Sequence, residues 1–150
     1  MDSVRDGRSI EHETTILAPP ERVFAAFTEQ AGLESWFVLR AEVDARAGGE
    51  FSFFWANQAV SGRFLDVSPP GTVVLAFDER PAANGETIVS VALTPVESGT
   101  TVHFFQTGFG DGSDWDALYE GMSAGWPDAF VDLKTWLETG MATPDGFRTG

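Results

Sequence analysis

Apolar and polar residues alternate through much of the chain between residues 10 and 107, and this two-residue period predicts β-strands. The alternation is clearest where Phe51, Phe53 and Trp55 fall on one face of a single segment. Most connections between these segments are of turn length, so we expect about six to seven strands that pair as an antiparallel meander. The expected strands are Ile10–Ala18, Leu39–Ala45, Glu50–Trp55, Ala59–Val67, Thr72–Asp78, Thr87–Thr94 and Thr100–Thr107.

Two other segments carry apolar residues at steps of three or four, which is the spacing of one face of a helix. The first begins at Pro20, and Gly32 is expected to divide it into two short helices. The second, residues 113–138, is expected to form one long amphipathic helix. Its apolar stripe consists of Trp115, Leu118, Tyr119, Met122, Trp126, Ala129, Phe130, Leu133, Trp136 and Leu137.

The ends of this long helix carry residues with strong positional preferences. Ser113 or Asp114 is expected to cap its start, and Gly140 stands where a helix-ending glycine is favoured. Pro127 has no amide hydrogen to donate inside the helix, so a bend is expected near Ser123–Trp126.

Together these elements predict an α+β fold in which a curved antiparallel sheet wraps around the long C-terminal helix. Two short helices follow the first strand, and the apolar stripe of the long helix must pack on the sheet. A twisted sheet and a cylindrical helix do not fit each other fully, so a cavity is expected between them. We expect one domain over residues 10–140, with flexible ends at residues 1–9 and 141–150.

The high aromatic content raises the possibility that this cavity binds a ligand. Thirteen Phe, five Trp and one Tyr make up 13% of the chain, and they indicate either a thick core or an apolar pocket. The residues predicted to contact an apolar ligand are Trp36, Phe53, Trp55, Phe64, Phe77, Phe104, Trp115, Tyr119, Met122, Trp126 and Phe130. The alternative for each of them is ordinary core packing. Arg40, Arg46 and Arg63 are candidate charged anchors for a ligand, or members of a solvated strand face.

Charge and composition remove several classes of partner. A net charge of −14, with Lys134 as the single lysine, argues against binding to nucleic acid or to an anionic membrane. The absence of cysteine excludes disulfides and thiolate chemistry. The polar start of the chain and the absence of a long apolar run predict a cytoplasmic protein.

Catalytic and metal-binding patterns are weak in this sequence. His12 and His103 are two isolated histidines, so no metal site is expected. No Gly-x-Ser-x-Gly motif marks a nucleophile, and the glycine-rich segment 108–112 lacks the lysine of a phosphate loop. The acidic group Asp111, Asp114 and Asp116 is interpreted as favourable charge at a helix start, with a polar gate to a pocket as the alternative. We therefore predict no catalytic residues and no cofactor.

Five local motifs occur in an order that is typical of one superfamily, namely Ala18–Phe24, Ala47–Phe51, Gly62–Val67, Gly99–Val102 with Gly108–Phe109, and Gly125–Trp126 with Leu133 and Leu137. Over roughly residues 10–140 the chain resembles the START-like, or helix-grip, proteins (SRPBCC). Within them it is most similar to the branch named after the activator of the heat shock protein 90 ATPase. It departs from that branch at Ala47, which stands where proline is usual, and at Pro127.

The resemblance implies a fold more than a function, since related folds hold lipid carriers, receptors, cyclases and chaperone cofactors. Our leading hypothesis is non-enzymatic binding of a small hydrophobic or amphipathic ligand between the sheet and the last helix. One alternative is a protein-interaction module that resembles a chaperone cofactor. The other is a cyclase- or hydrolase-type enzyme, which would need a buried polar residue with a perturbed pKa in the cavity. The oligomeric state stays open, with a homodimer among the states considered.

Overall fold

A computed structural model describes residues 8–142 except 57 and 81. All neighbouring strands in its seven-stranded sheet are antiparallel, in the order β1-β7-β6-β5-β4-β3-β2. The α+β class and the antiparallel meander are therefore confirmed. The elements are β1 (Ile10–Ile16), α1 (Pro20–Thr28), α2 (Gln30–Trp36), β2 (Arg40–Val43), β3 (Glu50–Phe54), β4 (Ala59–Ser68), β5 (Thr72–Asp78), β6 (Glu86–Val96), β7 (Gly99–Thr107) and α3 (Ser113–Thr139).

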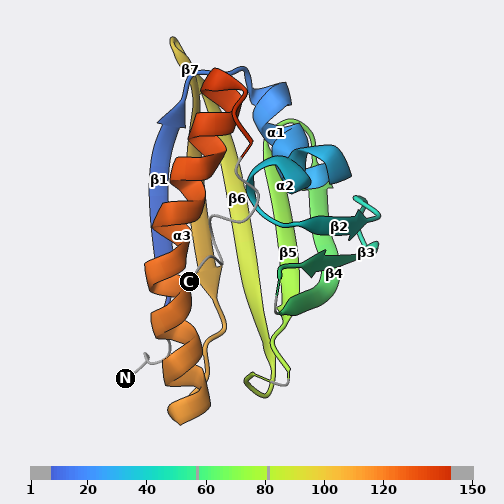
Figure 1. Cartoon of the computed structure of the whole chain (residues 1–150), viewed down its shortest axis with the longest axis vertical. Coiled ribbons are helices and arrows are strands. Elements are labelled where there is room, and N and C mark those ends of the chain that lie inside the picture. The colour runs from blue at the N-terminus through green and yellow to red at the C-terminus, as the bar shows by residue number, and fades with distance from the viewer. Residues whose placement is uncertain (1–7, 57, 81, 143–150) are drawn as a thin grey trace.

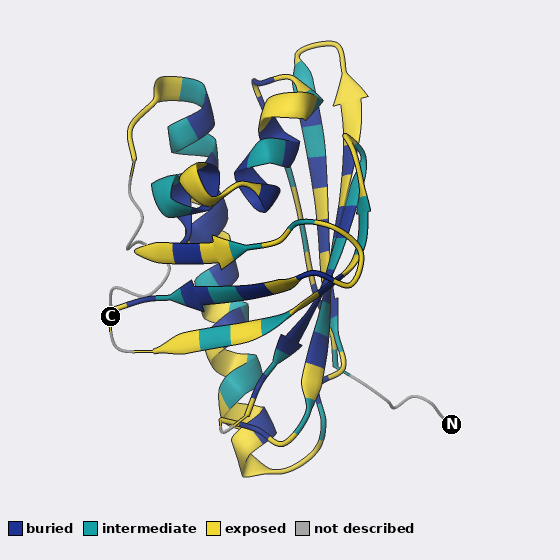
Figure 2. Cartoon of the chain, turned by 90° about the vertical axis from the view of Figure 1, so that its right-hand side faces the viewer, coloured by how far each residue is buried: buried dark blue, intermediate teal, exposed yellow. Residues whose placement is uncertain are grey.

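The long helix α3 crosses the inner face of this sheet, and α1 and α2 cover the same face beside its C-terminal half (Figure 1). The predicted stripe supplies the buried residues of α3, while the opposite side of the helix is exposed (Figure 2). Packing of the stripe on the sheet, which is the central prediction from the sequence, is confirmed. The buried residues of α3 are Trp115, Met122, Trp126, Ala129, Phe130, Leu133 and Leu137.

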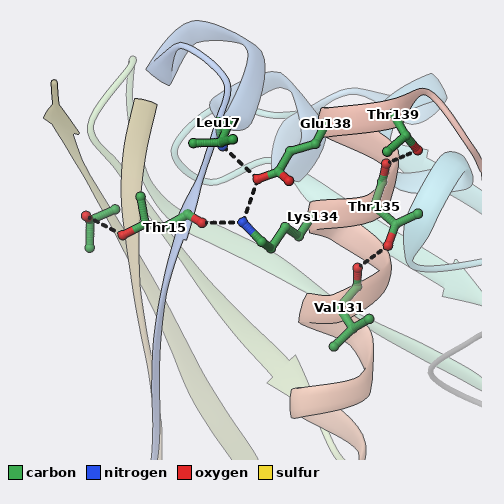
Figure 3. Close-up of polar contacts among 8 residues, drawn as sticks. Thr15, Leu17, Val131, Lys134, Thr135, Glu138 and Thr139 are labelled. Atoms are coloured by element: carbon green, nitrogen blue, oxygen red, sulfur yellow. Dashed lines mark hydrogen bonds and ion pairs between the residues drawn. The ribbon is translucent and has the colours of Figure 1, made fainter. Parts of the chain in front are cut away.

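The C-terminal half of α3 is fastened to β1 by polar contacts (Figure 3). Lys134 Nζ donates hydrogen bonds to the Thr15 carbonyl at 2.8 Å and to Glu138 Oε2 at 2.6 Å. The same Glu138 oxygen accepts the backbone N–H of Leu17 at 2.9 Å. These contacts hold the C-terminal end of α3 against the edge of the sheet.

The break between the two short helices lies at Glu29 and not at Gly32, so that expectation was wrong. Glu29 is extended, with φ −107° and ψ 143°, and it ends α1 and begins α2. Gly32 lies inside α2, where a Cβ atom would stand 2.8 Å from the Ala25 carbonyl oxygen and 2.9 Å from Ala26 Cα. Gly32 is therefore required for close packing of α2 on α1 and does not interrupt the helix.

The start of α3 also differs from expectation. Its capping position is Gly112, with φ 113°, and no side chain caps the helix, so neither Ser113 nor Asp114 has that role. Gly140 ends the helix in the left-handed conformation, as expected. Pro127 lies within an uninterrupted helix, and the bend near it stays a prediction. None of the three helices in the described part of the chain is long and apolar enough to span a bilayer.

Candidate functional site

A groove of about 510 Å³ opens between the first half of α3, the start of β4 and the end of β5. It forms because α3 presents Ala117 and Gly121 on this side, where no large side chain fills the space. A Cβ atom added to Gly121 would meet no other atom within 4 Å. The described lining residues are Trp55, Gln58, Ala59, Val60, Phe77, Asp78, Glu79, Arg80, Ala82, Ala117, Leu118, Gly121, Met122 and Trp126.

Four of the eleven predicted ligand-contacting residues line this groove, namely Trp55, Phe77, Met122 and Trp126. Phe77 and Trp126 also border a separate void of about 20 Å³, which is close to the space of a single water. Trp36, Phe53 and Phe104 border only that void. The sheet centre under α2 is therefore close-packed, and the open space lies toward the start of α3.

The remaining four predicted residues line neither space. Phe64 is fully buried and its ring lies edge-on to that of Phe51, with centroids 5.6 Å apart. Phe130 stacks on the His12 ring at 4.8 Å. The rings of Trp115 and Tyr119 both meet Phe109 edge-on. As described, these four residues pack in the core or at the start of α3.

Glu79 is a buried carboxyl group in the groove, and the sequence analysis did not select it. It lies in the turn after β5, and its residue surface is only 4% exposed. Burial raises the pKa of Glu79 to about 7; the hydrogen bond from Thr87 opposes this rise, and the negative charge of Asp78 adds to it. Glu79 is therefore a buried polar residue with a perturbed pKa, which is what a cyclase- or hydrolase-type enzyme would need in this cavity.

A chain of hydrogen bonds connects Glu79 to Trp126 through the interior. Trp126 Nε1 donates to Gln106 Oε1 at 2.8 Å, and Gln106 Nε2 donates to Thr87 Oγ1 at 2.9 Å. Thr87 Oγ1 then donates to Glu79 Oε2 at 2.6 Å. The indole nitrogen can only donate, so it fixes the orientation of the Gln106 amide and, through it, the direction of the whole chain. Along this path each donor points toward the Glu79 carboxyl group, while Gln106 Nε2 also donates to Met122 Sδ at 3.3 Å.

The other two charged residues in the described lining form a pair at the groove rim. Arg80 Nε donates to Asp78 Oδ1, and another Arg80 nitrogen donates to Asp78 Oδ2, both at 2.9 Å. Hydrogen bonds from Arg80 lower the pKa of Asp78 to about 2. This two-pronged pair leaves Glu79 as the carboxyl group in the groove lining that has no cationic partner among the described residues.

The histidines and the candidate arginine anchors lie outside the groove lining. Partial burial lowers the pKa of His12, which stacks on α3, while His103 pairs with Glu11 at 2.6 Å. Within the residues that the structure describes, no three His, Cys, Asp or Glu side chains gather in a way that could hold a metal ion. Each of the three candidate arginines pairs with a nearby carboxylate: Arg40 with Glu42, Arg46 with Asp44 and Arg63 with Glu86.

The sequence held one signal of the buried network. Gln106 falls at an inward position of β7, in step with Val102 and Phe104, and a polar residue on an apolar face requires internal partners. No comparable signal marks Glu79, because a run of Asp, Glu and Arg after a strand is the ordinary composition of an exposed turn.

Comparison with known proteins gives one family and a consistent fold. The model of the family described as Activator of Hsp90 ATPase homolog 1-like protein matches residues 17–138. No curated protein sequence matches the chain significantly.

Solved structures of similar proteins agree with this match. A protein from Mesorhizobium loti is 27% identical with a TM-score of 0.78, over 87% of this chain and 97% of that one. The solution structure of the Aha1 dimer from Colwellia psychrerythraea is 25% identical with a TM-score of 0.77, over 89% and 98%. CalU16 from Micromonospora echinospora is 22% identical with a TM-score of 0.75, over 95% and 81%, a likeness that concerns the fold alone.

Proposed function

Because the chain belongs to the family of Activator of Hsp90 ATPase homolog 1-like proteins, we propose that it binds a small hydrophobic or amphipathic molecule in the groove between α3 and the sheet. Membership of this family agrees with the resemblance found in the sequence. The observation that carries the proposal is the groove itself, whose volume of about 510 Å³ falls within the range of about 300–1,000 Å³ of small-molecule sites.

The walls of the groove suit an apolar ligand with one polar group. Trp55, Phe77, Met122 and Trp126 provide aromatic and thioether surface, which is polarisable and accommodates varied shapes. Glu79 provides a single buried polar group that would orient a ligand. Of the predicted ligand residues, we therefore retain these four and add Glu79.

A catalytic use of the same groove is the alternative that Glu79 favours. A carboxyl group with a pKa of about 7 is suited to general acid–base chemistry near neutral pH. We place binding first, because the charged groups of the described lining are this one carboxyl and a carboxylate–guanidinium pair.

A protein-interaction role is a second candidate, supported by the family name and by an exposed apolar surface. Leu17 and Val96 are 58% and 41% exposed, and they border a shallow depression together with Pro19, Pro20 and Pro95. The related protein from Colwellia psychrerythraea is described as a dimer. Sedimentation of the purified protein over a range of concentrations would test self-association.

Filling the groove should weaken binding of an uncharged apolar dye. We expect Gly121→Phe to weaken Nile red binding by roughly tenfold or more, which corresponds to about 1.4 kcal/mol, because the new ring occupies open space. Fluorescence titration of the native protein measures the change. Ala117→Phe, one turn earlier on the same helix, is an independent second variant.

Gly121→Ala is the matched control for this experiment. It adds one methyl group in open space, improves helix propensity by about 1 kcal/mol, and should leave dye binding near that of the unmodified protein. Native dye binding that is unchanged in both phenylalanine variants would contradict the proposed location of the site.

A further inference from the structure

Among the residues that the structure describes, Glu79 is the charged group of the groove lining that has no partner of opposite charge. Asp78 and Arg80 neutralise each other in the same turn, and Glu86 on β6 pairs with Arg63 on β4 at 2.8 Å. The residues that α3 contributes to the described lining are all uncharged. A buried carboxylate without a countercharge is costly, since desolvation removes its stabilisation by water. A ligand with a positive charge would supply the countercharge for the Glu79 carboxylate.

The direction of the interior network shows which atom of Glu79 is left for a ligand. Thr87 donates to Oε2, and Oε1 accepts no hydrogen bond among the described residues. The donors are fixed in sequence from Trp126 through Gln106 to Thr87, so Oε2 is already committed as an acceptor. A hydrogen-bond donor in the groove is therefore the natural partner of Oε1.

The surroundings favour a cation over an anion at this point. The chain carries a net charge of −14, which attracts cations and repels anions at long range. Arg80, the cationic residue of the described lining, has two of its nitrogens bound to Asp78. Because Asp78 already balances the charge of Arg80, an anionic ligand would gain little from Arg80 and would place its own charge near Glu79.

We propose that the groove binds an amphipathic amine, with its ammonium group on the Glu79 carboxylate and its apolar part against Trp55, Phe77 and Trp126. This inference rests on the proposed function and specifies its ligand class. Burial raises the pKa of Glu79 to about 7, so the carboxylate form that binds the ammonium becomes populated as the pH rises through neutrality. Amine binding should accordingly strengthen between about pH 6 and pH 8.5.

Three ligands with the same tail test the charge preference: decylamine, 1-decanol and decanoate. Each competes with Nile red for the native protein at about pH 6 and about pH 8.5, and the amine stays protonated at both. At the higher pH we expect decylamine to bind roughly tenfold more tightly than 1-decanol, and decanoate to bind most weakly. At the lower pH the advantage of the amine over the alcohol should shrink.

The variant Glu79→Gln should remove this advantage and its pH dependence, while 1-decanol and Nile red still bind. Glutamine keeps the acceptor for Thr87 but carries no charge. Glu120→Gln removes the same charge from an exposed position on α3 and serves as the matched control for long-range attraction. It should leave the preference for the amine within about twofold of the unmodified protein.

The experiment distinguishes failure of the amine inference from failure of the groove proposal. If Nile red and 1-decanol bind but the amine has no advantage, or keeps it in Glu79→Gln, the amine inference is overturned and the groove proposal stands. If none of the four probes binds the native protein, the proposed function itself fails.

Discussion

Replacing Trp126 with alanine is expected to lower the free energy of unfolding by about 3–5 kcal/mol, the cost of removing a large ring from a packed core. The indole is buried and its ring lies 4.4 Å from that of Phe104 and 5.5 Å from that of Phe37. The substitution also deprives Gln106 Oε1 of its donor. A buried polar atom without a partner lowers the free energy of unfolding by a further ~1–3 kcal/mol. Small domains have a total stability of only about 5–15 kcal/mol.

Trp126→Phe separates these two contributions. It keeps most of the ring but removes the N–H, so it should show mainly the smaller cost of the unpaired Gln106 carbonyl, about 1–3 kcal/mol. Chemical denaturation followed by far-ultraviolet circular dichroism measures both variants. If Trp126→Ala unfolded at nearly the same denaturant concentration as the unmodified protein, Trp126 would not be the core residue that the structure describes.

The second large effect is a stability difference that depends on pH. Burial disfavours the charged form of Glu79 and raises its pKa from 4.5, the ordinary value of a solvated glutamate, to about 7 in the folded protein. Its contribution to stability is therefore fully present below about pH 4.5 and is lost as the pH rises through about 7. The difference between these two pKa values corresponds to about 3 kcal/mol of folding free energy.

Glu79→Gln cannot ionise, so its stability relative to the unmodified protein should rise across this pH interval. At about pH 8 we expect the variant to be more stable by up to about 3 kcal/mol, and at about pH 4 we expect the difference to be smallest. Denaturation midpoints measured at several pH values give the difference directly. Other carboxylates titrate in both proteins and cancel, and Glu120→Gln controls for the loss of one surface charge. A difference that stays flat with pH would show that Glu79 is solvated.

The fold followed from the sequence because its determinants are local. Alternation in Glu50–Phe54 and the continuous apolar run of Thr72–Asp78 both indicate strands, and the short turns between strands leave adjacent antiparallel pairing as the simple solution. The errors came where tertiary contacts override local preference. Gly32 has the composition of a helix break, but its lack of a side chain is used where α2 approaches α1. Nothing in the sequence around Glu29 indicates that the chain becomes extended there.

The site was harder to predict than the fold, because burial of a polar residue depends on segments far apart in the chain. The wedge between helix and sheet was expected, and Trp55, Phe77, Met122 and Trp126 line it. Periodicity shows which residues face inward, but it does not show at which point along α3 the packing opens. Residues such as Phe64 and Phe130 share the same inward pattern and lie in filled space. Glu79 lies against Thr87 on β6 and beside α3, and these segments lie far from each other in the chain.

The strand order has a consequence for how the chain reaches this structure. Each pair of neighbouring strands is consecutive in sequence except β1 with β7, where Ile16 lies opposite Thr100. Hairpins of short contact order form quickly, whereas joining ends separated by most of a chain requires a large loop to close. Docking of α3 through Lys134 and Glu138 depends on β1 being in place. We therefore expect the meander from β2 to β7 to form before β1 pairs with β7, and α3, which supplies one wall of the groove, to dock after that pairing.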